Sequence, residues 1–242
     1  MRKSSNNFVL YILILILFIS YLVYTQTTKE IAQKAFPSVV MIVMQDSNGQ
    51  PLYLGSGFFI WENVVVTNFH VIEGAAKGYV RVIGQNTKYD IAGIVGIDYE
   101  RDLVLLFIPN AKVPYLSIGD TSNLSIGDEV YVIGNPRGLE GTFSQGIISG
   151  KRNIDQSTIF QITAPISSGS SGGPVINNQG KVIGVAVATL EGGQNLNFAI
   201  PASYLATLVS DLKPVSSLSI KKVEQNKSIT DKMDGFTVEG VT

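Results

Sequence analysis

The hydrophobic pattern begins with one long apolar segment. Residues 8–24 are apolar apart from Ser20, and no charged residue occurs between Lys3 and Lys29. A membrane-spanning helix needs about 17–25 apolar residues, so this segment is predicted to cross a membrane. No small-residue cleavage motif follows it, which favours an uncleaved signal anchor over a cleaved signal peptide. Positive charge on Arg2, Lys3 and the amino terminus favours a cytoplasmic location for residues 1–7, with residues 25–242 outside.

After a polar tether or short helix at 25–35, short apolar runs alternate with turn residues. This pattern is typical of antiparallel β-barrels and sandwiches. The first set of predicted strands is Ser38–Met44, Ser56–Trp61, Val64–Asn68, Tyr79–Ile83, Ile91–Ile97 and Leu103–Ile108. The second set is Glu129–Gly134, Gly146–Gly150, Ile159–Ile162, Pro174–Ile176, Val182–Ala188 and Asn197–Ile200.

The polar stretch 114–128 separates the two sets of strands. We therefore expect one structural unit over 36–113 and a second over 114–213. Within the second unit, apolar positions at helical spacing after Pro201 predict a C-terminal helix. Ser203 is its expected N-cap, and Lys213-Pro214 follows its end.

Composition restricts the chemistry that the chain can perform. The 242 residues include no Cys and one His, and the formal net charge is -1. The absence of Cys excludes disulfides, thiolate metal sites and a Cys nucleophile. A single His excludes a poly-histidine metal site, and the balanced charge argues against nucleic acid as a partner. No cofactor is expected.

Two local motifs carry candidate chemistry. Ser171 lies in the glycine-rich sequence Gly169-Ser170-Ser171-Gly172-Gly173, where its hydroxyl could be exposed on a tight turn with backbone N–H groups close by. Such turns are also common as plain loops. The only histidine, His70, ends an apolar run that should form a strand, where a structural role is the alternative to a catalytic one.

A catalytic histidine needs an acid to orient it, and five aspartates are candidates: Asp90, Asp98, Asp102, Asp120 and Asp128. Asp102 is preferred because it precedes the strongly apolar run Leu103–Phe107, where an acid would be partly buried and would need a partner. Pairing with the neighbouring Arg101 is the alternative. The resulting order His70, Asp102, Ser171 is the chymotrypsin-type order of a catalytic triad.

With these residues in order, the chain resembles a trypsin-fold serine protease of the HtrA (Deg) family. The resemblance covers about residues 36–212 and depends on seven ordered blocks: 55–60, 67–72, 98–106, 134–138, 146–149, 164–175 and 197–201. It implies an all-β fold of two six-stranded antiparallel β-barrels with a C-terminal helix, preceded here by one transmembrane helix. The active site would lie in the cleft between the barrels.

The resemblance also implies roles for individual residues. Ser171 would be the nucleophile, His70 the general base and then acid, and Asp102 the group that orients the imidazole. The backbone N–H groups of Gly169 and Ser171 would form the oxyanion hole. Ser170 departs from the Asn that is common in the family, a small polar change that could alter how the loop settles.

The same resemblance implies which substrate residues the enzyme would prefer. Pro165 stands where trypsin-like enzymes carry an Asp, so a preference for basic residues is not expected. Ile166 and Leu196 match apolar pocket positions, and the strand Ala186-Val187-Ala188 would pair with the substrate backbone. Small or medium aliphatic residues are the expected preference on the acyl side of the cut.

The remaining expectations concern the C-terminus and the partners. Segment 214–242 is too short for a complete PDZ domain, and it reads either as a truncated PDZ start or as a polar tail. The family implies cleavage of unfolded or damaged proteins outside the bacterial cytoplasmic membrane, and a homo-trimer. A protease-like module that binds peptides without turnover is the alternative function, and a β-rich structural membrane protein is a third.

Overall fold

The computed structural model describes residues 8–9, 11–14, 26–135, 141–154, 156–187, 197–218 and 228–229. The helical elements are α2 (Thr28–Ala35), the 3₁₀ turn η1 (Phe36–Ser38), α3 (Phe69–Ile72) and α4 (Ala202–Val209). The first seven strands are β1 (Val39–Gln45), β2 (Pro51–Trp61), β3 (Val64–Asn68), β4 (Lys77–Val82), β5 (Lys88–Asp90), β6 (Gly93–Asp98) and β7 (Leu103–Phe107). The others are β8 (Glu129–Gly134), β9 (Thr142–Ile154), β10 (Ser157–Ile162), β11 (Pro174–Ile176), β12 (Val182–Val187) and β13 (Asn197–Pro201).

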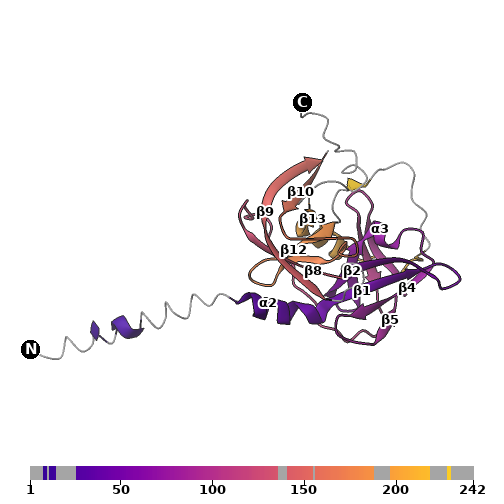
Figure 1. Ribbon diagram of the computed structural model, residues 1–242, viewed down its shortest axis with the longest axis horizontal. Helices are drawn as coiled ribbons and strands as arrows, with labels where there is room; N and C mark the ends of the chain where they lie inside the picture. The colour runs from indigo at the N-terminus through magenta and orange to yellow at the C-terminus, as the bar shows by residue number, and fades with distance from the viewer. Residues whose placement is uncertain are drawn as a thin grey trace, which may run out of the picture.

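The strands form two sheets that lie side by side, the first in purple and the second in pink to orange (Figure 1). The second sheet is a closed barrel of six strands in the order β10-β13-β12-β11-β8-β9. This confirms the expected architecture for the second half of the chain. All of its strand pairs are antiparallel.

The first sheet differs from the expected six-stranded barrel. It is a seven-stranded sheet in the order β5-β4-β1-β2-β3-β7-β6. The outer edge of β6 pairs with the chain segment that follows α4: Ile94 and Ser216 exchange two backbone hydrogen bonds of 2.9 and 2.8 Å. Because this segment occupies the edge of β6, the sheet does not close there onto β5, which pairs with β4.

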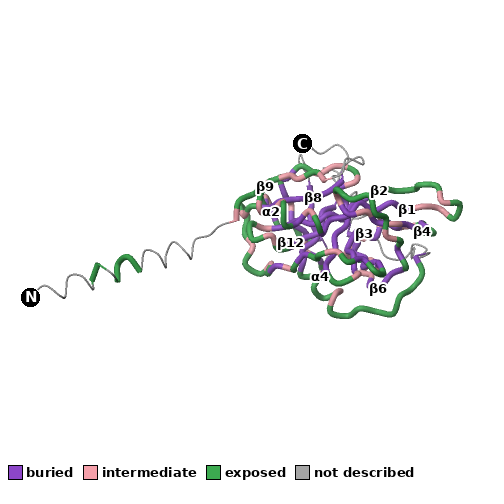
Figure 2. Tube along the Cα trace, turned by 90° about the horizontal axis from the view of Figure 1, so that it is seen from below, coloured by how far each residue is buried: buried purple, intermediate pink, exposed green. Residues whose placement is uncertain are grey.

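The central strands of the two sheets are buried on both faces. Along β3, Val65 belongs to the core inside the first sheet, whereas Val64 and Val66 belong to a second core that both sheets share. Along β8, Val132 faces the interior of the barrel and Ile133 faces the shared core. Figure 2 shows the buried segments gathered in the middle of the molecule. Burial on both faces explains why these strands read as continuous apolar runs rather than as alternating ones.

Both ends of the folded region pack onto the sheets. Helix α2 begins with a capping box between Thr27 and Glu30, and it buries Ile31 and Ala35. Helix α4 begins at Ala202 and not after Ser203, so the predicted N-cap is wrong. The chain enters α4 directly from β13 through Pro201, whose φ of -56° already suits the start of a helix.

The predicted membrane segment is only partly described. Residues 8–9 and 11–14 are helical, and the rest of 8–24 lies outside the described residues. Within the described part of the chain, no helix has the length and apolar character needed to cross a membrane. The anchor therefore stays a prediction.

Candidate active site

Ser171 lies in a tight turn between β10 and β11. Gly169 and Gly172 have φ values of +93° and +83°, a region in which residues with a Cβ are strained. A Cβ on Gly172 would also overlap Thr67 Oγ1 and the Ser56 carbonyl. Glycine is therefore favoured at 169 by its backbone conformation, and at 172 both by its backbone conformation and by close approach to the first sheet.

His70 and Asp102 lie just beyond the ends of two neighbouring strands of the first sheet, β3 and β7. Asn68 ends β3 and pairs with Leu103 at the start of β7, so the residues just beyond these ends are neighbours. The Asp102 Oδ1 accepts the His70 backbone N–H at 2.9 Å, and Oδ2 lies 2.6 Å from His70 Nδ1. Asp102 is buried, whereas the His70 side chain is 37% exposed.

Strand β2 connects the turn that carries Ser171 with the helix that carries His70. The Ser56 N–H donates to the Ser171 carbonyl at 2.9 Å. On the neighbouring residue, a Cβ on Gly55 would meet the side chain of Val71, next to His70. Strand β2 thus lies between the Ser171 turn and the His70 helix and contacts both.

The backbone of the turn leaves two donors for a ligand. The N–H groups of Ser170, Gly172 and Gly173 donate to the carbonyls of Ser167, Ala186 and Ser170 at 2.9–3.0 Å. Among the described residues, the N–H groups of Gly169 and Ser171 have no such acceptor. These are the two donors that the family resemblance assigns to an oxyanion hole, and neither is used by a backbone acceptor within the turn.

The other candidate acids have different surroundings. Asp90 is exposed in β5, and Asp128 accepts the Ser125 N–H. Asp120 is exposed, and hydrogen bonds from the backbone and side chain of Ser122 hold its pKa below the ordinary aspartate value. Among the described residues, Asp102 is the one of the five that contacts His70.

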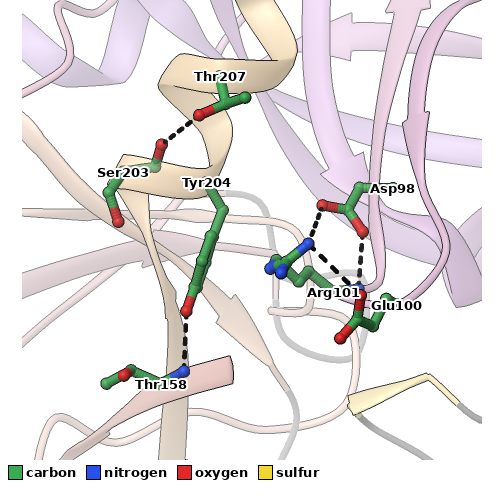
Figure 3. A network of polar contacts seen from close by, with 7 residues as sticks. All are labelled: Asp98, Glu100, Arg101, Thr158, Ser203, Tyr204 and Thr207. Atoms are coloured by element: carbon green, nitrogen blue, oxygen red, sulfur yellow. Dashed lines mark hydrogen bonds and ion pairs between the residues drawn. The ribbon is translucent and has the colours of Figure 1, made fainter. Parts of the chain in front are cut away.

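Arg101 pairs away from Asp102, which removes the alternative partner considered for that acid. Its guanidinium contacts Asp98 at 3.0 Å and stacks over the ring of Tyr204 in α4, 4.4 Å from the centroid (Figure 3). Burial lowers the pKa of the Arg101 guanidinium. The hydrogen bond and charge of Asp98, together with the charge of Glu100, outweigh this effect and raise the pKa above its ordinary value. This turn and α4 line a cavity of about 610 Å³, separate from the Ser171 turn.

The expected substrate-pocket residues are only partly described. Ile166 is half-buried and packs against the core of the barrel, and Ala186 and Val187 are fully buried. The Ala186 N–H and carbonyl bond to Gly173 and Gly172, so the backbone of Ala186 is occupied by the turn rather than open to a substrate strand. Ala188 and Leu196 lie outside the described residues.

Two buried polar residues at the site had no role assigned from the sequence. Ser56 and Asn135 are 0% and 1% exposed, and they hydrogen-bond to each other beneath the Ser171 turn. The one feature of the sequence that could have indicated a role for Ser56 and Asn135 is that each is a polar residue next to an apolar run. Within the described ranges, no group of three or more His, Asp and Glu side chains is arranged to hold a metal ion.

Comparisons with known proteins identify the family to which the chain belongs. A family model described as the trypsin-like peptidase domain matches residues 55–185, a range that contains His70, Asp102 and Ser171. A probable periplasmic serine endoprotease DegP-like of Chlamydia trachomatis serovar D is 40% identical over 167 residues, which is 65% of this chain and 33% of the relative. The chloroplastic protease Do-like 1 of Arabidopsis thaliana is 34% identical over 201 residues, 77% of this chain and 44% of the relative.

Solved structures give the same result. The HtrA-type protease AlgW with tripeptide has a TM-score of 0.70 at 28% identity, covering 76% of this chain and 63% of that chain. The chain spans about a third of the length of the first curated relatives that it matches. The matched domain, the shared fold and the ordered motifs all support one conclusion. This chain belongs to the trypsin-like serine peptidase family, among its HtrA (Deg) members.

Proposed function

We propose that the chain is a serine endopeptidase that uses Ser171, His70 and Asp102 to cleave extended segments of unfolded or damaged proteins. The observation that carries this proposal is the double contact of Asp102 with His70, at 2.9 and 2.6 Å, beside a glycine turn that carries Ser171. One half of the machinery then comes from the unit 36–113 and the other from the unit 114–213.

In the first step, Ser171 Oγ attacks the carbonyl carbon of the substrate peptide. A neutral His70 that donates Nδ1–H to Asp102 has Nε2 as its basic nitrogen, and Nε2 takes the serine proton. The carbonyl oxygen becomes negative and is stabilised by the N–H groups of Gly169 and Ser171. When the intermediate collapses, the C–N bond breaks and His70 returns the proton to the leaving amine.

In the second step, water hydrolyses the acyl-enzyme. His70 removes a proton from water, the hydroxide oxygen bonds to the acyl carbon, and the bond to Ser171 Oγ breaks. The proton then returns to Ser171 and the acid product leaves. The Asp102 carboxylate stabilises the imidazolium that forms twice in the cycle.

A covalent probe tests the assignment of the nucleophile. The parent chain should be labelled by a fluorophosphonate and should cleave casein, and Ser171→Ala should lose both activities while it keeps its fold. Ser170→Ala, which removes the neighbouring buried hydroxyl of the same turn, should still be labelled. If the parent is not labelled, or if Ser171→Ala still cleaves casein, the proposal is wrong.

The half-buried Ile166 and the exposed Pro165 support a preference for aliphatic residues before the cut. Neither side chain offers a negative charge to a basic substrate residue. Because the backbone of Ala186 is occupied, substrate pairing by strand addition would start at Val187. Cleavage-site sequencing of a digested unfolded protein should show aliphatic residues, and an excess of Lys or Arg before the cut would contradict this specificity.

The apolar segment 8–24 supports anchoring in a bacterial cytoplasmic membrane, with the peptidase domain on the outer side. The relative from Chlamydia trachomatis is named a probable periplasmic serine endoprotease, which favours the same side. Carbonate washing should leave the chain in the membrane pellet, and protease added to spheroplasts should reach residues after Lys34.

A homo-trimer is the expected assembly, and sedimentation of the detergent-purified chain would reveal a monomer if this is wrong.

A further inference from the structure

The hydroxyl of Ser56 occupies a central position between the two sheets. Ser56 belongs to β2 and is fully buried. Its hydroxyl donates to the Gly169 carbonyl at 2.6 Å and accepts from the Asn135 N–H at 2.9 Å, and Asn135 Nδ2 lies 3.3 Å away. A hydroxyl has one proton and two acceptor positions, so these contacts use its full hydrogen-bonding capacity.

Asn135 fixes the position of this hydroxyl. It directly follows β8, its Nδ2 donates to the Val40 carbonyl of β1 at 3.1 Å, and its Oδ1 accepts the Gly141 N–H at 3.2 Å. The Ser56 oxygen is therefore held by β1, β2 and the end of β8 together. A donor fixed in this way can restrain a more adaptable segment.

The segment that it restrains is the Ser171 turn. The Ser56 backbone N–H binds the Ser171 carbonyl, a contact that most residue types could make, but the bond to the Gly169 carbonyl needs the hydroxyl. Gly169 has no Cβ to limit its φ and ψ, so its conformation must be set by bonds from outside. The bond from Ser56 fixes the Gly169–Ser170 peptide plane, whose N–H points to Ser167 on the opposite side.

We propose that Ser56 is a positioning residue for peptide hydrolysis, whose hydroxyl holds the Gly169–Ser170 peptide, the unit that connects the peptides carrying the Gly169 and Ser171 N–H groups. This inference rests on the proposed function. Ser56 itself does not contact the substrate. Oxyanion donors act more strongly on the transition state than on the bound substrate, so loss of the hydroxyl should slow the chemical step and leave binding unchanged.

The test is the labelling kinetics of the full chain, purified in detergent, with a fluorophosphonate. In this reaction Ser171 Oγ bonds to phosphorus as His70 takes its proton, fluoride leaves, and the phosphoryl oxygen takes the place of the oxyanion. For Ser56→Ala we expect the maximal labelling rate to fall about 10–100-fold, below the 10²–10³ that loss of a whole donor costs. The probe concentration for half-maximal rate should stay at the parent value.

Ser157→Ala is the matched control. Ser157 is also a buried serine, 3% exposed, and its hydroxyl has no hydrogen-bond partner within the described part of the chain. It should label like the parent. Ser56→Cys keeps a weak donor, on a larger sulfur atom, so its rate should lie between those of the parent and Ser56→Ala; it also carries the test if Ser56→Ala does not fold.

The possible results separate the two proposals. A folded Ser56→Ala chain that labels at the parent rate overturns the role of Ser56 and leaves the proposed function intact. The same holds if Ser157→Ala slows labelling as much, or if Ser56→Ala changes only the half-maximal concentration. An unlabelled parent chain overturns the proposed function, and the role of Ser56 with it.

Discussion

The carboxylate of Asp102 contacts His70 through both of its oxygens, once at the backbone N–H and once at Nδ1. Asp102 adopts a φ of +54°, a conformation that costs a residue with a Cβ about 1–3 kcal/mol. Its own carbonyl accepts hydrogen bonds from the Phe69 N–H and from Asn68 Nδ2. Contacts with three consecutive residues, 68–70, therefore hold the strained backbone that turns the carboxylate toward the imidazole.

Replacing Asp102 by Asn should reduce kcat by about 10⁴-fold, because the amide favours the wrong imidazole tautomer and does not stabilise the imidazolium. The fold should persist, since Asn also tolerates positive φ. The measurement is casein or peptide cleavage together with a thermal melt of the same preparation.

Asp120→Asn is the matched control for this prediction. Asp120 is exposed, and its side chain bonds only locally to Ser122 among the described residues. Its replacement should leave kcat unchanged. If the Asp120 variant loses activity and the Asp102 variant keeps it, the acid of the triad has been assigned to the wrong residue.

The rate should depend on pH through His70, the only histidine in the chain. An imidazole accepts the serine proton only when it is neutral, and a histidine ordinarily loses its charge near pH 6.5. We therefore expect kcat/KM to rise with pH across about pH 6–7.5 and then to level off. A flat profile between about pH 5 and 8, with the fold verified at each pH by circular dichroism, would contradict His70 as the base.

Most strands could be predicted because their apolar runs are bounded by turn residues. Val64–Asn68, Glu129–Gly134 and Pro174–Ile176 have the predicted bounds. The sequence did not predict β5 (Lys88–Asp90), whose short, mostly polar sequence gains its strand geometry from pairing with β4. The strand predicted at Gly146–Gly150 is shorter than the observed β9 (Thr142–Ile154). The additional residues are mostly polar, and they take strand geometry from pairing with β8 and β10.

The site shows the same limit at the level of single residues. The apolar run that follows Asp102 was enough to single it out as the partner of His70, and the structure brings their side chains together. The roles of Ser56 and Asn135 depend on hydrogen bonds between residues 113 and 79 positions apart. No local pattern of residues specifies such contacts, which arise only when the two sheets pack.

Tyr204 in α4 links the helix to both halves of the molecule (Figure 3). Its hydroxyl accepts the Thr158 N–H of β10 at 2.8 Å, and its ring lies under Arg101. Tyr204→Phe removes the hydroxyl and leaves the partly buried Thr158 N–H without its acceptor. We therefore expect the free energy of unfolding to fall by about 1–2 kcal/mol. Tyr53→Phe, at a tyrosine that is 51% exposed, is the control and should be neutral in urea denaturation. Equal midpoints for the two variants would mean that the Thr158 contact adds nothing.

Ile229 tests whether the segment after α4 is a solvated tail or part of the folded core. Its side chain is 2% exposed and belongs to the core that both sheets share, and its N–H donates to the Glu100 carbonyl at 2.8 Å. Ile229→Ala keeps the backbone bond and removes only buried side-chain atoms, so it should lower the free energy of unfolding by about 2–5 kcal/mol. Val215→Ala, at an apolar residue of the same segment that is 49% exposed, should change it by less than about 0.5 kcal/mol. If urea denaturation gives the same small change for both variants, Ile229 does not pack on the core in solution, and the description of this segment as a polar tail is the correct one.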